Sequence, residues 1–223
     1  SQAVADEVCC WVGENKPQRV LSHRIGYFHL GGDLSNSVPT IGLPDNASQV
    51  LASIALQPSF LMVSTIEPRK GYAQVLSAFE ELWRDGLKVT LVIVGSAGWK
   101  MDDVMHKLRT HPKQGKHLFW LEGISDEYLE KVYTAATCLI AASTGEGFGL
   151  PLIEAAQHKL PIIARDIPVF REVAGEFAYY FAGKEPLDLA AAIKEWVALY
   201  ENDRHPKSDQ MPWLTWRQSA EQF

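Results

Sequence analysis

Runs of apolar residues alternate with amphipathic stretches between residues 60 and 200. Six short apolar runs predict strands, over residues 60–64, 89–94, 117–121, 137–142, 160–164 and 177–181. Apolar positions at helical spacing predict helices over residues 72–84 and 100–110, after Ser125, after Pro151, over residues 189–200 and within residues 213–223. Strands that alternate with helices form βαβ units, so we expect an α/β fold, with a parallel sheet and helices on both of its faces.

The first 58 residues follow a different pattern. A first predicted helix has its apolar positions on one face: Val4, Val8, Trp11 and Val12. Residues 23–30 alternate loosely, as a strand does, and residues 33–58 are polar with three prolines, which predicts a loop or linker. We therefore expect a separate segment over residues 1–58, with a linker and a first strand, and a ligand-binding domain over residues 59–223.

Composition narrows the class of protein. The chain has 223 residues, 47% of them hydrophobic, and a net charge of -6, which argues against a nucleic-acid-binding protein. Its three cysteines show no metal-ligand spacing, so a reducing cytosol is expected. No apolar run has the length of a membrane span and no signal peptide opens the chain. Ser1 begins within a pattern, as we expect of a fragment.

A glycine-rich turn over residues 145–149 separates the fourth predicted strand from a helix with Pro151 in its first turn. This arrangement leaves free backbone N–H groups at the helix N-terminus, where a phosphate binds well. Glu146 lies in the turn and Glu154 one helical turn inside the helix, so we expect both carboxylates to face the same crevice. Because a carboxylate can accept hydrogen bonds from both hydroxyls of a sugar diol, these features predict a nucleotide-sugar site.

A basic pair, Arg69 and Lys70, follows the first strand of the predicted sheet. Cations near the start of a helix oppose its dipole, so their placement suggests an anionic partner such as a diphosphate. Ligands on parallel sheets bind beyond the carboxyl ends of the strands. Four predicted loops lie at those ends and are expected to converge on one crevice: residues 64–71, 95–98, 122–125 and 143–150.

The motifs together resemble those of one family. Glu146 and Glu154, in the stretch EGFGLPLIE, are similar to the paired glutamates of retaining glycosyltransferases with the two-domain GT-B fold. The stretch STIEPRKG resembles a signature of mannosyltransferase-like, group 1 members. It departs from that signature at Ser64 and Gly71, and Thr65 stands where many relatives have an arginine. With further similarities in VGSAGW, DIPVFREV and WLTW, nearly the whole chain resembles the C-terminal, donor-binding, Rossmann-like domain of such an enzyme.

The resemblance implies a role for each site residue. Arg69 and Lys70 would neutralise the leaving diphosphate, and Glu154 would hold the ribose diol. Three side chains would act in catalysis: Glu146, Arg69 and Lys70. The sugar hydroxyls and the phosphate would be held by the glycine-rich turn: Glu146, Gly147, Phe148, Gly149 and Leu150. The base would be read by the backbone at one position and an apolar side chain at another: Ile124 and Leu129.

The resemblance also implies substrates and partners. The donor would be a nucleotide diphosphate sugar, with GDP-mannose favoured, and the acceptor a glycan or a lipid-linked glycan. Transfer would retain the anomeric configuration and need neither a metal nor a cofactor. The enzyme would be cytoplasmic and could contact the membrane surface. The N-terminal acceptor domain would be missing, residues 1–58 would form the interdomain segment, and the chain alone would be inactive.

Two other functions stay open. Gly145-x-Gly147-x-Gly149 suggests a dinucleotide-dependent oxidoreductase, but the third glycine falls one residue early for the dinucleotide-binding pattern. A non-catalytic module that binds nucleotide sugars would carry the same site residues. The sequence separates that module from an enzyme only weakly.

Overall fold

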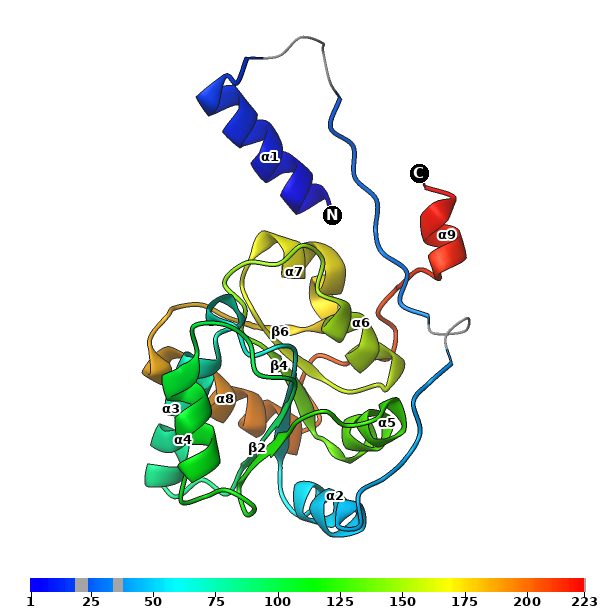
Figure 1. Cartoon of the computed structure of the whole chain (residues 1–223). Coiled ribbons are helices and arrows are strands. Elements are labelled where there is room, and N and C mark those ends of the chain that lie inside the picture. The colour runs from blue at the N-terminus through cyan, green and yellow to red at the C-terminus, as the bar shows by residue number, and fades with distance from the viewer. Residues whose placement is uncertain (19–23, 34–37, 223) are drawn as a thin grey trace.

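The structure is a computed structural model that describes residues 1–18, 24–33 and 38–222. At its centre, these residues form a parallel sheet of six strands in the order β3-β2-β1-β4-β5-β6 (Figure 1). The strands are β1 (Ser59–Val63), β2 (Thr90–Val94), β3 (Leu118–Leu121), β4 (Cys138–Ala141), β5 (Ile162–Arg165) and β6 (Tyr179–Phe181). The predicted parallel sheet is confirmed.

Each face of the sheet is covered by its own layer of helices (Figure 1). One layer contains α3 (Tyr72–Arg84), α4 (Asp102–Thr110) and α8 (Pro186–Glu201). The other contains α2 (Ala47–Ala55), α5 (Asp126–Ala135), α6 (Leu150–Gln157) and α7 (Pro168–Ala174). Neighbouring residues of one strand serve opposite layers: Phe60 packs edge-on against Phe79 and Trp196, whereas Leu61 faces the second core. Helices on both faces are therefore confirmed.

The strand order decides where a ligand can bind. From β1 the chain continues to β2 on one side, and from β4 it continues to β5 on the other. β1 and β4 lie side by side, so the topology reverses between them. In open α/β sheets the ligand crevice lies beyond the carboxyl ends of the strands at such a switch point. The loops after β1 and β4 are therefore the first place to look for a site.

Most predicted elements form, and α3 has the bounds expected for it. The loop expected over residues 33–58 is wrong between Ala47 and Ala55, where α2 forms. This helix buries Ala47 and Ile54 in the core beneath α5, so burial of a short apolar face outweighs the polar and proline-rich surroundings. Residues 34–37 of that loop lie outside the described residues.

The strand expected over residues 23–30 is wrong for residues 24–30, and residue 23 lies outside the described residues. A strand needs a neighbouring strand, and residues 24–30 have none within the described ranges. The chain instead meets the C-terminal segment just beyond, where Gly32 N donates to Leu214 O at 2.8 Å. That segment ends in the short helix α9 (Trp216–Ala220), within the range predicted for a last helix.

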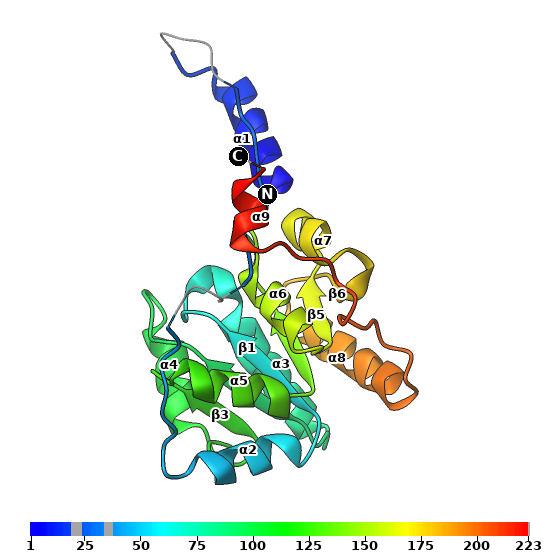
Figure 2. The ribbon, with the colours of Figure 1, turned by 90° about the vertical axis from the view of Figure 1, so that its right-hand side faces the viewer.

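The first helix, α1 (Gln2–Asn15), forms as predicted but buries none of its residues. Figures 1 and 2 show it projecting from the body of the molecule. Its N-terminus is attached to α7, because Gln2 N and Ala3 N donate to the Glu172 carboxylate at 2.7 and 2.8 Å. Across the part of the chain that the structure describes, no helix combines the length and apolarity needed to cross a membrane.

Candidate functional site

The loops after β1 and β4 touch at the switch point. A turn of 3-10 helix (Pro68–Lys70) ends at Gly71, which has a φ of 79°. A Cβ atom at Gly71 would lie 2.5 Å from Ala142 O at the end of β4, so only glycine permits this approach. Thr144 N donates to Arg69 O at 2.8 Å and joins the two loops.

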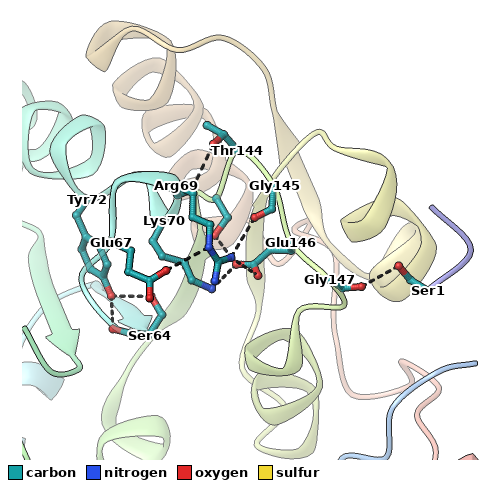
Figure 3. A network of polar contacts seen from close by, with 11 residues as sticks. Ser1, Ser64, Glu67, Arg69, Lys70, Tyr72, Thr144, Gly145, Glu146 and Gly147 are labelled. Carbon is teal, nitrogen blue, oxygen red and sulfur yellow. Dashed lines mark hydrogen bonds and ion pairs between the residues drawn. The ribbon is translucent and has the colours of Figure 1, made fainter. Parts of the chain in front are cut away.

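Both carboxylate oxygens of Glu146 are paired with the basic residues of the loop after β1 (Figure 3). Lys70 Nζ donates to Oε1 at 2.5 Å, and Arg69 Nη1 donates to Oε2 at 2.9 Å. Ser143 Oγ adds a hydrogen bond to Oε1 at 2.7 Å. The Arg69 guanidinium also contacts Glu67 Oε2 at 3.1 Å. The structure therefore brings together Arg69, Lys70 and Glu146, the three side chains for which the resemblance implies a role in catalysis.

The electrostatics of Glu146 follow from these contacts. Its side chain is 12% exposed, and burial alone would raise its pKa. Hydrogen bonds from Lys70, Ser143 and Arg69 outweigh burial and hold the pKa of Glu146 below its usual value. Lys70 is similarly buried, whereas the Arg69 side chain is 47% exposed. At neutral pH the carboxylate therefore joins one buried cation and one solvent-facing cation.

A narrow recess lies beside this cluster. It is lined by both loops, by the start of α6 and by the aromatic ring of Phe170 on α7. The other lining residues include Ser64, Lys70, Ser143, Glu146 and Gly149. Its volume of about 20 Å³ is room for roughly one water molecule. A ligand larger than a water molecule would therefore have to lie over the recess or displace side chains that line it.

The helix α6 begins at the recess, as the glycine-rich turn predicts. Gly149 takes a φ of 99° at its N-cap and Pro151 lies in its first turn. The structure shows no side-chain hydrogen bond at this N-cap. The positive end of α6 and the two cations therefore lie close together, at a point suited to an anion.

Two further residues of the glycine-rich turn, Gly147 and Phe148, contact the N-terminal segment. Ser1 Oγ donates to Gly147 O at 2.8 Å (Figure 3). Phe148 is buried, and its ring lies 5.3 Å from the ring of His29. The N-terminal segment therefore supports the turn from the side away from Arg69 and Lys70.

Glu154 lies on α6 but does not line the recess. Its Oε2 accepts a hydrogen bond of 2.6 Å from Tyr133 Oη of α5. The structure thus places Glu146 beside the cations and Glu154 beside α5. That both acids border one ligand stays a prediction.

The residues predicted to hold the base lie at the start of α5. Ile124 and Leu129 are half-buried and pack against the core beneath α5 and α6. Leu129 and Tyr133 are four residues apart and therefore share one face of the helix. Ser125 caps α5 as predicted, since its Oγ accepts from Tyr128 N at 3.1 Å. The face of α5 that donates a hydrogen bond to Glu154 therefore extends toward the residues predicted to hold the nucleotide base.

Arg165 is a site residue that the sequence analysis missed. It lies at the carboxyl end of β5 and is 6% exposed. Its Nε donates to Ala142 O at 3.0 Å, and its other nitrogens donate to Gly183 O and Gln74 Oε1. The guanidinium thereby fixes the end of β4, directly before the Glu146 loop. The signal available in the sequence was a cation directly after the apolar run predicted as a strand over residues 160–164.

Metal binding finds no support in the described side chains. Among residues 1–18, 24–33 and 38–222, no group of three or more His, Cys, Asp or Glu side chains could hold a metal ion. The charged groups that the structure gathers at the switch point are those of Arg69, Lys70, Glu67 and Glu146.

The doubly wound sheet, with the loops after β1 and β4 meeting at its switch point, defines a Rossmann-like α/β domain. The chain belongs to the Glycosyl transferases group 1 family, whose model matches residues 45–209. It is 56% identical over 225 residues to the serotype-specific mannosyltransferase WbdA of Escherichia coli. That match covers 99% of this chain and 27% of WbdA, so the chain spans about a quarter of the length of this relative. The resemblance read from the motifs is confirmed.

Solved structures show the same fold. A sucrose-phosphate synthase from Thermosynechococcus elongatus superposes with a TM-score of 0.64 at 23% identity, over 79% of this chain and 46% of its own. The C-terminal domain of the group 1 protein LpcC from Francisella tularensis gives a TM-score of 0.57 at 20% identity. This second match covers 74% of our chain and 89% of that domain. The predicted Rossmann-like α/β fold is confirmed.

Proposed function

We propose that this chain is the donor-binding part of a retaining mannosyltransferase. It would bind a nucleotide diphosphate sugar, with GDP-mannose as the favoured donor, for transfer to a glycan or a lipid-linked acceptor. The observation that carries this proposal is the pairing of Arg69 and Lys70 with Glu146, directly at the N-terminus of α6. Family membership and the similarity to WbdA support mannose as the sugar.

The charges suggest how the site would act on its donor. The diphosphate takes the place of the Glu146 carboxylate between Arg69 and Lys70. Both cations then stabilise the negative charge that develops on the diphosphate as its bond to the sugar breaks. The freed carboxylate accepts hydrogen bonds from the sugar hydroxyls, and the backbone N–H groups of residues 147–150 donate hydrogen bonds to the sugar and the phosphate. These side chains supply the positive charge without a metal or a cofactor.

The nucleoside would lie between α5 and α6. Glu154 accepts from the ribose hydroxyls, while Ile124 and Leu129 meet the base. The acceptor would come from a separate N-terminal domain, with residues 1–58 as the connection. The enzyme would work in the cytoplasm, with contact to the membrane through other parts of the protein.

A non-catalytic nucleotide-sugar module is the second candidate, since the chain spans about a quarter of WbdA. A dinucleotide-dependent oxidoreductase is disfavoured, because the chain belongs to a glycosyltransferase family. A thermal-shift screen of GDP, UDP, ADP and their sugars tests the proposal. We expect GDP and GDP-mannose to raise the melting temperature of this chain most. A screen in which no nucleoside diphosphate stabilises it would contradict the donor site.

A further inference from the structure

Tyr133 and Glu154 join the two helices that border the proposed nucleoside site. The Tyr133 hydroxyl donates to Glu154 Oε2 at 2.6 Å, from α5 to α6. Tyr133 is 2% exposed, whereas Glu154 is only half-buried. Within the described ranges no other side chain or backbone group donates to the Glu154 carboxylate. One oxygen is thus held from the protein side, and Oε1 keeps its capacity to accept.

The direction of the tyrosine hydroxyl is itself fixed. The Tyr133 ring stacks on the His158 ring, with centroids 4.7 Å apart and planes 3° from parallel. His158 Nε2 lies 3.3 Å from Glu130 Oε2, which ties the stacked pair back to α5. Burial first, and then the neighbouring Glu154 carboxylate, raise the pKa of Tyr133 well above its ordinary value, so the hydroxyl remains a donor.

We propose that Tyr133 is a positioning residue that orients the Glu154 carboxylate toward a ribose diol. This inference rests on the proposed function, in which Glu154 binds the ribose. A glutamate on a helix surface samples several rotamers, and ordering it on ligand binding lowers affinity. The hydrogen bond to Tyr133 holds Oε2 before the ligand arrives and leaves Oε1 for the ribose hydroxyls. The effect is therefore specific for ligands that carry those hydroxyls.

The test compares GDP with 2′,3′-dideoxy-GDP by calorimetry on the 223-residue chain. The ratio of the two affinities measures what the ribose hydroxyls contribute. Tyr133→Phe keeps the ring and its stack on His158 but removes the hydroxyl. We expect it to reduce this ratio about 3- to 10-fold, as the loss of a single hydrogen bond does. Its affinity for dideoxy-GDP should stay at the wild-type value, which also shows that the variant is folded.

A matched control is available on the same helix. Tyr128 is 1% exposed, and its Oη has no hydrogen-bond partner among the described residues. Tyr128→Phe therefore also removes a buried hydroxyl from α5, but one that contacts no carboxylate. We expect it to leave the affinity ratio unchanged.

Glu154→Ala separates failure of the inference from failure of the proposed function. We expect it to abolish the preference for GDP over the dideoxy ligand. If Glu154→Ala removes the preference and Tyr133→Phe leaves it at the wild-type value, the positioning role is overturned while the ribose site stands. If Glu154→Ala leaves the preference intact, or the wild-type chain does not bind GDP, the ribose site and the role of Tyr133 both fall.

Discussion

At the residue scale, the Glu146 carboxylate occupies the place that a diphosphate would need. Its two oxygens bind Lys70 and Arg69 at 2.5 and 2.9 Å, and both cations also suit a phosphate. A bound diphosphate would therefore compete with this carboxylate for the same donors. The contributions of the cations and of the acid can be measured separately.

Removal of both cations should weaken binding of the diphosphate but not of the nucleoside. We expect Arg69→Ala combined with Lys70→Ala to reduce GDP affinity about 10- to 100-fold, since hydrogen bonds to charged groups are lost. Guanosine affinity should remain at the wild-type value in calorimetry. Arg84→Ala with Lys88→Ala removes the same charge from exposed positions and should leave both affinities unchanged. Equal losses of GDP and guanosine affinity in the site variant would argue against a phosphate contact.

The lowered pKa of Glu146 predicts a pH-dependent contribution to stability. Because its pKa in the folded chain lies below the ordinary 4.5, the charged form favours folding above that value. This contribution is lost as pH falls through the folded-state pKa. In urea unfolding we expect the wild type to be more stable than Glu146→Gln at pH 7, with the gap narrowing as pH falls below about 4.5. A gap that stays constant with pH would show that the ion pairs contribute nothing.

At the scale of elements, the contact between the loops after β1 and β4 depends on Gly71. Its positive φ and the approach to Ala142 O both disfavour a side chain. Gly71→Ala should therefore destabilise the chain by more than the roughly 1–2 kcal/mol of a positive φ alone, and should weaken GDP binding by displacing Arg69 and Lys70.

Gly86→Ala is the control for that experiment. Gly86 has a similar φ of 82°, but nothing lies within 4 Å of the Cβ position. It should show the conformational penalty in chemical unfolding and leave GDP affinity unchanged. Equal effects of the two substitutions on stability and binding would refute the role of the loop contact.

Sequence patterns predict the elements whose burial is periodic. The helix α3 and the strands β1, β2 and β4 can be recognised from their apolar residues alone, because each element packs on the core over its whole length. The nine-residue α2 buries only Ala47 and Ile54, which is too few positions to establish a period. Residues 24–30 alternate as a strand does, but alternation does not provide the partner that a strand needs.

The residues of the site also divide into those that the sequence predicts and those that it does not. Arg69, Lys70 and Glu146 are predictable because each follows a strand at the carboxyl edge of the sheet, and the strand order brings these loops together. The contact between Tyr133 and Glu154 cannot be predicted from the sequence, because it depends on how far α5 and α6 are offset along their axes. Two of the three hydrogen bonds of Arg165 go to backbone carbonyls, which residue identity does not reveal, and the third goes to the distant Gln74 side chain.

At the scale of the whole molecule, the described residues form one six-stranded sheet, and α1 contacts the core beneath α7 only at its first turn, through Ala3. None of the residues of α1 is buried, and the chain spans about a quarter of the length of WbdA. We therefore expect the 223-residue chain to bind GDP-mannose without transferring mannose. An assay with radiolabelled donor and a mannan acceptor should give no product with this chain alone. Transfer by the chain alone would contradict the need for a second domain.

The ion pairs within this cluster affect which anions it would admit. Arg69 and Lys70 face Glu67 and Glu146, so the local charges cancel. Free inorganic phosphate is abundant in cells, and to enter it must displace a carboxylate while offering few hydrogen-bond donors in return. A nucleotide sugar brings hydroxyls for the displaced acid as well as phosphates for the cations. If the cluster binds a donor as we propose, its internal ion pairs would select against a small anion that could otherwise block it.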